Sequence, residues 1–247
     1  LALTLVAFVQ TETPLFGLDK DSAEHLRATG PLVAVWMAVF AVPLFLWTPD
    51  TPSRGLRLKE AFRRGRETLM DTLRRVRDYA HIVRFLIAHM MYAEGLNTLF
   101  AFGGIYAAVT FGMEFDELIL FGIAINLPAG LGAAAFAWVD DWIGPKRTIM
   151  IAVGGLMVLG TALVLVEGKA LFWAFALPLG IFVGPAQAAS RSLMARLAPP
   201  EMTTEMFGLY ALSGKATSFI GPAVLAWVTA ALASQRAGMA TILVFLT

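Results

Sequence analysis

The fold is decided by residues 49–79, which read PDTPSRGLRLKEAFRRGRETLMDTLRRVRDY and separate two long apolar parts of the chain. Nine basic residues stand in this segment against five acidic ones. Loops rich in Lys and Arg beside membrane spans stay on the cytoplasmic side, because their translocation is unfavourable. The segment therefore predicts a cytoplasmic connection, and it orients every neighbouring span.

The same segment has the periodicity of a helix. Its apolar residues recur at spacings of about three, four and seven, with arginines between them; they are Leu58, Phe62, Leu69, Leu73 and Val76. We expect an amphipathic helix on the cytoplasmic face, with its apolar side on lipid or on the ends of neighbouring helices. A site for a specific partner is the alternative, although the adjacent spans leave no room for a soluble nucleic-acid-binding domain.

The composition is that of a membrane protein that crosses the bilayer several times. Hydrophobic residues make up 58% of the chain and charged residues 15%, whereas soluble domains have about 45–50% and about 25%. The sequence contains no cysteine, which excludes disulfides and thiolate metal sites. Its histidines, His25, His81 and His89, lack the spacing of metal ligands. We expect neither a metal nor another cofactor.

Long apolar runs predict the spans. Residues 1–9 read as the tail of one span and residues 31–47 as the next, with an acidic outer connection at residues 10–29. Complete spans follow at residues 82–109, 118–139, 148–166, 171–194 and 207–232, and a partial span at residues 239–247. Runs of this length must satisfy their backbone internally, so each is predicted to be a helix. Because both ends fall within apolar runs, we read the chain as part of a longer membrane protein.

Two groups of motifs carry a family resemblance. Residues 141–147 read DWIGPKR, with Asp141, then Gly144, then Lys146 and Arg147 before the next helix. This resembles the inner-loop signature of the major facilitator superfamily, although Trp142 stands where a basic residue is usual. The segments 92–98 (YAEGLNT), 187–192 (QAASRS), 195–199 (ARLAP), 207–218 (FGLYALSGKATS) and 234–236 (SQR) look like the vacuole-effluxer branch of that superfamily.

The resemblance covers essentially the whole chain. It implies an all-α, polytopic transmembrane helical bundle, of which this chain covers about the end of helix five to the start of helix twelve. Residues 1–48 would then end the N-terminal six-helix half, residues 49–80 form a cytoplasmic basic linker, and residues 81–247 form the C-terminal half. The resemblance also implies efflux of small solutes by alternating access, with amino acids the substrate class of the eukaryotic members. We expect a multi-pass protein of a bacterial inner membrane.

Polar side chains inside the predicted spans mark a candidate cavity. A charge at the bilayer centre costs roughly 2.5–3.5 kcal/mol, so it normally faces a partner or a wet cavity. Glu94 lies about 18 Å into its span, and Asn97 and Thr98 follow on the same face. We expect substrate or coupling roles for Glu94, Asn97, Thr98, Asn126, Gln187 and Lys215. A structural carboxyl hydrogen-bonded to a neighbouring helix, or an ion pair with Lys215, are the alternatives for Glu94.

A second group of residues is expected to form an inner gate. Its members are Asp141, Gly144, Lys146, Arg147 and Arg191. Asp141 can hold an adjacent helix N-terminus through the helix dipole. Arg191 can bind a substrate carboxylate through two parallel hydrogen bonds, or anchor its helix at the headgroups.

These expectations favour a transporter over other classes of membrane protein. We expect a secondary active transporter of a small solute, with protons as the candidate coupling ion. The spans show no nucleophile and base, and no metal cluster, so an enzyme is not expected; nor is binding to nucleic acid. The alternative is a non-transporting membrane scaffold or receptor of the same fold.

Overall fold

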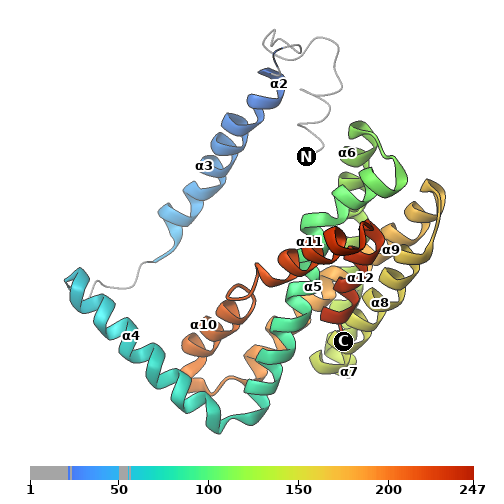
Figure 1. The fold of residues 1–247 in the computed structure, drawn as a ribbon. Coiled ribbons are helices and arrows are strands. Elements are labelled where there is room, and N and C mark those ends of the chain that lie inside the picture. The colour runs from blue at the N-terminus through green and yellow to red at the C-terminus, as the bar shows by residue number, and fades with distance from the viewer. Residues whose placement is uncertain (1–21, 23, 50–54, 56) are drawn as a thin grey trace. The chain divides into compact units, whose positions relative to one another are not determined.

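The computed structural model describes residues 22, 24–49, 55 and 57–247 (Figure 1). The span tail predicted at residues 1–9 lies outside this part of the chain, as does the first half of the outer connection. The chain divides into two compact units, residues 1–63 and 64–247. All regular structure in the described residues is helical, so the all-α prediction is confirmed.

The first unit holds the span predicted at residues 31–47. After the short helix α2 (Glu24–Arg27), α3 runs from Thr29 to Trp47. None of its residues is buried, and it presents large apolar side chains such as Phe45 and Trp47. A helix that is apolar on all sides is suited to lipid or to the interior of a membrane bundle.

The predicted amphipathic helix is α4 (Leu58–Arg75), which carries the boundary between the two units and leads into the 3-10 helix η3 (Val76–Asp78). The apolar side chains of α4 are exposed along most of the helix. Leu58 and Phe62 are 88% and 79% exposed, whereas Val76 is buried. The helix is therefore confirmed, and its stripe is available to a lipid surface.

The second unit is a helical bundle. Its helices are α5 (Ala80–Phe111), α6 (Phe115–Ala124), α7 (Asn126–Ile143), α8 (Pro145–Leu165), α9 (Lys169–Leu197), η4 (Pro200–Met202), α10 (Thr203–Ser213), α11 (Ile220–Leu232) and α12 (Gln235–Phe245). Four stretches in the described residues are long and apolar enough to cross a membrane: Thr29–Trp47, Phe115–Ile143, Pro145–Leu165 and Lys169–Leu197. The protein is therefore a multi-pass integral membrane protein.

The predicted span at residues 207–232 is broken by a six-residue turn, which corrects the expectation of a continuous helix there. The predicted span at residues 118–139 is also divided, between α6 and α7, but only at Ile125. Helix α10 ends at Ser213, a turn follows over residues 214–219, and α11 begins at Ile220. Gly214 has a low helix propensity, and Ser213 and Ser218 bond to nearby backbone carbonyls, which competes with helix formation. Pro222 follows in the first turn of α11, where its missing N–H is tolerated.

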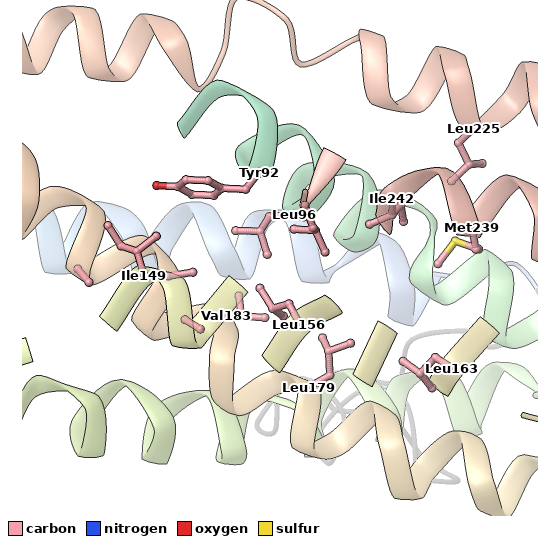
Figure 2. Close-up of a cluster of buried hydrophobic side chains, with 14 of the residues drawn as sticks. Tyr92, Leu96, Ile149, Leu156, Leu163, Leu179, Val183, Leu225, Met239 and Ile242 are labelled. Carbon is pink, nitrogen blue, oxygen red and sulfur yellow. The ribbon is translucent and has the colours of Figure 1, made fainter. Parts of the chain in front are cut away.

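The core surrounds α5 and the seam between α7, α8 and α9. Figure 2 shows the buried cluster, with Tyr92 and Leu96 of α5 opposite Leu156 of α8 and Val183 of α9. Small residues bring α7 and α9 into close contact. A Cβ at Gly184 would lie 3.0 Å from the Cβ of Ala133, and a Cβ at Gly132 would collide with the carbonyl of Ile181. Close approach at small residues stabilises helix pairs in membranes.

The α7–α9 contact gives a test with a matched control. The change Gly132→Ala should lower stability by about 1–3 kcal/mol, because the backbone of Ile181 must shift. The change Gly130→Ala, two residues away in the same helix with nothing near its Cβ position, should be neutral or slightly stabilising. Thermal unfolding midpoints of the two purified variants in detergent check this. Equal midpoints would contradict the packing described for α7 and α9.

Candidate functional site

The candidate site is a pocket of about 190 Å³ between α5, α9, α10 and the turn that follows α10. Its walls are His89, Tyr92, Ala93, Leu96 and Asn97 of α5, Gln187 and Arg191 of α9, Tyr210 and Ala211 of α10, and Gly214 and Lys215 of the turn. The structure thus brings together residues that the sequence places in three separate spans. Asn97, Gln187, Arg191 and Lys215 belong to the predicted site residues.

An aromatic cluster forms one wall of this pocket, and the sequence analysis missed it. The imidazole of His89 stacks on the ring of Tyr210, with centroids 4.2 Å apart, and meets Tyr92 edge to face at 5.3 Å. His89 Nδ1 also lies 2.8 Å from the hydroxyl of Ser213. The signal was present in the sequence, because His89, Tyr92 and Leu96 follow one another at i, i+3 and i+7 on one helix face.

A buried hydrogen bond fixes α5 against α9 beside the pocket. The hydroxyl of Tyr92 bonds to the hydroxyl of Ser190, and that serine donates to the carbonyl of Ala186 within α9. Tyr92 and Ser190 are both buried. This pins the turn of α9 that carries Gln187 and Arg191, whose side chains are exposed toward the pocket.

The charge of the pocket is positive. Arg191 and Lys215 both line it, and no described carboxylate lines it with them. Ion pairs elsewhere in the described residues include Arg74 with Asp71, Lys169 with Glu117, and Arg236 with Glu167. Neither Arg191 nor Lys215 pairs with a carboxylate of the described residues, and the guanidinium of Arg191 faces the hydroxyl of Tyr210. Both cations can bind an anionic group, and a guanidinium suits a carboxylate or phosphate in a two-point contact.

Glu94 and Thr98 lie on a different face of α5 from the pocket. Glu94 Oε2 accepts a hydrogen bond from the backbone N–H of Gly221 at 3.0 Å, at the start of α11. Thr98 is fully buried and also lies against Gly221. Glu94 thus has the hydrogen bond to a neighbouring helix that the sequence left as an alternative, and its carboxylate forms no ion pair with Lys215.

Asn97 differs from its neighbours because successive helix positions point about 100° apart. Its side chain is exposed to the pocket, and its Nδ2 donates to the carbonyl of Gly214 at 3.4 Å. The three polar residues expected on one face are therefore divided: Asn97 lines the pocket, and Glu94 and Thr98 pack on α11.

Asn126 lies elsewhere. It lines a larger apolar cavity of about 470 Å³, together with residues such as Leu118, Leu156 and Phe172. Its side-chain amide donates to the carbonyl of Gly122 one turn earlier. The polar group of Asn126 is thus engaged within its own chain segment.

The predicted gate residues separate into two places. Asp141, Gly144, Lys146 and Arg147 meet at the connection between α7 and α8. Gly144 has a φ of +84°, a backbone conformation that favours glycine, and its carbonyl accepts from the hydroxyl of Thr148. Arg191 lies in the pocket instead.

The absence of cysteine from this chain permits a test of the pocket by thiol labelling. In a background without other cysteines, Asn97→Cys and Gln187→Cys should react with a charged, polar maleimide. Thr98→Cys, adjacent to Asn97 but fully buried, should react at least tenfold more slowly, because burial limits access to the thiol. Labelling of Thr98→Cys at the rate of Asn97→Cys would contradict the described orientation of α5.

Comparison with known proteins supports a transporter family. The model of the family described as vacuole effluxer Atg22-like matches residues 2–247. The chain is 25% identical over 241 residues to an uncharacterized MFS-type transporter, YxiO, of Bacillus subtilis (strain 168), with 95% of this chain and 53% of that protein covered.

Fungal proteins are similar at the same level. Autophagy-related protein 22 of Cryptococcus neoformans var. neoformans serotype D (strain B-3501A) is 25% identical over 255 residues, with 94% of this chain and 46% of that protein covered. The protein of the same name from Coccidioides immitis (strain RS) is 23% identical over 230 residues, with 83% and 38% covered. The chain thus spans about half the length, or less, of the curated relatives it matches. It belongs to the vacuole effluxer Atg22-like family.

Proposed function

We propose that this chain is part of a secondary active transporter that moves a small, carboxylate-bearing solute out of a compartment by alternating access. The observation that carries the proposal is the pocket lined by two cations without a carboxylate partner, Arg191 and Lys215, beside a break in the predicted span at residues 207–232. The bacterial relative YxiO is described as an uncharacterized MFS-type transporter, which supports the same class.

The pocket offers distinct contacts to the parts of such a solute. Arg191 and Lys215 supply charge-assisted hydrogen bonds to a carboxylate. Asn97 and Gln187 provide amide donors and acceptors. The stacked rings of His89 and Tyr210 provide a flat apolar surface. Amino acids share the carboxylate, and their ammonium group is attracted by the face of a tyrosine, so we retain amino acids as the substrate class.

The broken span provides a means of movement. Lys215 is carried by the turn at residues 214–219 rather than by a regular helix. Irregular backbone is tolerated in a membrane where it lines a cavity, and transporters place binding groups at such breaks. We propose that this turn changes position when the pocket changes the side to which it opens.

The proposed orientation of the chain in the membrane follows from the basic residues of its connecting segments. Residues 49–80 are assigned to the cytoplasmic side of a bacterial inner membrane, as a linker between residues 1–48 and the C-terminal half at residues 81–247. The connection that carries Asp141, Gly144, Lys146 and Arg147 lies on the same side under this proposal. Protons are the proposed coupling ion.

Substitution of the two cations tests the proposed role of the pocket. Arg191→Gln and Lys215→Gln in the full-length protein should each raise the KM for the transported solute about 10- to 100-fold, because a hydrogen bond to a charged group contributes about 1.5–3 kcal/mol. Arg196→Gln is the control, since Arg196 is an exposed arginine at the end of the same helix and does not line the pocket. Uptake into proteoliposomes measures all three.

The same preparation defines the substrate. Labelled neutral and acidic amino acids, small carboxylates and amines are offered with and without an imposed pH gradient. Saturable, gradient-dependent uptake of carboxylate-bearing solutes is expected. Uptake of amines alone would contradict the assignment of Arg191 and Lys215. No uptake of any solute by folded protein would favour a non-transporting scaffold or receptor.

A further inference from the structure

The charged side chains of α4 are sorted by sign around the helix. Successive residues of an α-helix are about 100° apart, which places the apolar stripe on one side of α4, at Leu58, Phe62, Leu69 and Leu73. The carboxylates share the opposite side, at Glu60, Glu67 and Asp71. Basic residues fill both flanks between them; they are Lys59, Arg63, Arg66 and Arg74 on one flank and Arg64 and Arg75 on the other. The helix thus has an apolar side, two basic flanks and an acidic side.

The apolar stripe and both flanks of α4 are exposed. Leu58 is 88% exposed and Leu73, at the other end of the stripe, is still 38% exposed. The six basic side chains of the flanks are exposed as well. Within the part of the chain that the structure describes, this helix is buried only near its C-terminal end, at Thr72, with Val76 buried just after it. An apolar stripe that is exposed in this way marks an interaction surface.

The segments that adjoin α4 keep it beside a bilayer. The candidate membrane span α3 ends at Trp47, and only residues 48–57 separate it from the first residue of α4. At the other end, η3 and Tyr79 lead directly into α5, which contains the predicted span at residues 82–109. Tethering raises the effective concentration of a binding segment at its target. A membrane surface is therefore within reach of α4 at all times.

The order of charges around α4 matches the chemistry of an anionic membrane surface. Long basic side chains beside an apolar stripe extend their stems along apolar surface and place the charge at the level of the headgroups. The stripe enters the boundary between headgroups and acyl chains, so phosphates meet both flanks at once, whereas the carboxylates point to water. The ion pair of Arg74 with Asp71 joins two exposed side chains at 3.9 Å. Such pairs contribute little, so Arg74 can exchange Asp71 for a phosphate.

We infer that α4 is a docking helix for the anionic phospholipids of the membrane in which the protein is embedded. Its apolar stripe inserts at the boundary of headgroups and acyl chains, and the arginines on both flanks bind the phosphates. Amphipathic helices bind membranes through buried apolar area together with attraction to anionic lipids. This role is separate from solute transport and does not depend on it.

Fluorophores on two sides of α4 test the docking in the full-length protein. In a background without other cysteines, one fluorophore is attached at Gly65→Cys, on the apolar side, where nothing lies within 4 Å of an added Cβ. The control fluorophore is attached at Glu67→Cys, on the acidic side. The proteins are placed in phosphatidylcholine vesicles with or without phosphatidylglycerol. A lipid with a nitroxide near its headgroup quenches a fluorophore that lies in the membrane surface.

Strong quenching is expected at position 65 and weak quenching at position 67 when phosphatidylglycerol is present. Quenching at position 65 should fall when this lipid is omitted. It should also fall as ionic strength rises, because salt screens exposed charges.

Loss of single charges tests the two flanks. Arg66→Gln and Arg75→Gln, one on each flank, should each lower the ratio of membrane-bound to unbound helix about fivefold, the effect of one basic residue near an anionic surface. Arg196→Gln removes the same charge from the end of α9 and should leave the quenching at position 65 unchanged.

Three results would overturn the inference. Equal quenching at positions 65 and 67 would show that the apolar side does not face lipid. Strong quenching at position 65 that neither phosphatidylglycerol nor the arginine variants change would show apolar contact without recognition of anionic lipid. A fluorophore at position 65 that is shielded from water but not quenched by the labelled lipid would show that protein covers the stripe. None of these results depends on solute uptake, so the inference and the transport proposal fail separately.

Discussion

The structure depends on how the interrupted span α10–α11 satisfies its backbone hydrogen bonds inside a membrane, where little water is present. In the hydrocarbon region of a bilayer, backbone N–H and C=O groups must find partners within the protein. The interrupted span α10–α11 finds two of them on α5: Asn97 donates to Gly214 before α11, and Glu94 accepts from Gly221 at its start. Two polar side chains of one continuous helix therefore hold both ends of the interruption in its neighbour. Figure 1 shows the continuous α5 and the break between α10 and α11.

Helix α5 therefore uses two separate faces for two different contacts. One face carries Asn97 and the aromatic residues His89 and Tyr92 into the pocket, and another carries Glu94 and Thr98 to α11. The seam of α7, α8 and α9 is closely packed, since a Cβ added at Gly184 would lie only 3.0 Å from the Cβ of Ala133. These closely packed helices thus stand beside a turn that is not a regular helix, although local backbone hydrogen bonds such as Ser218 N–H to the carbonyl of Lys215 support it. Such a contrast is suited to a protein in which a short segment moves against a fixed support.

Much of this architecture is predictable from sequence, because lipid imposes strong rules on length and polarity. The helices at residues 82–109, 148–166 and 171–194 and the amphipathic helix all follow from apolar runs and periodicity, and Asn97, Gln187, Arg191 and Lys215 were singled out by their polarity within spans. Depth along a span, however, does not give the direction in which a side chain points, so the separation of Asn97 from Glu94 was not predictable. The break after Ser213 depends on weak local preferences near Gly214, and the roles of His89 and Tyr210 depend on contacts between helices distant in sequence.

The most direct test of the account is a cryo-electron microscopy structure of the full-length protein in lipid nanodiscs. In that structure, Arg191 and Lys215 are expected to face a solvent-filled cavity open to one side of the membrane, with Glu94 held at the start of α11. It would be contradicted by a structure in which these two cations are buried against other protein segments or directed into lipid.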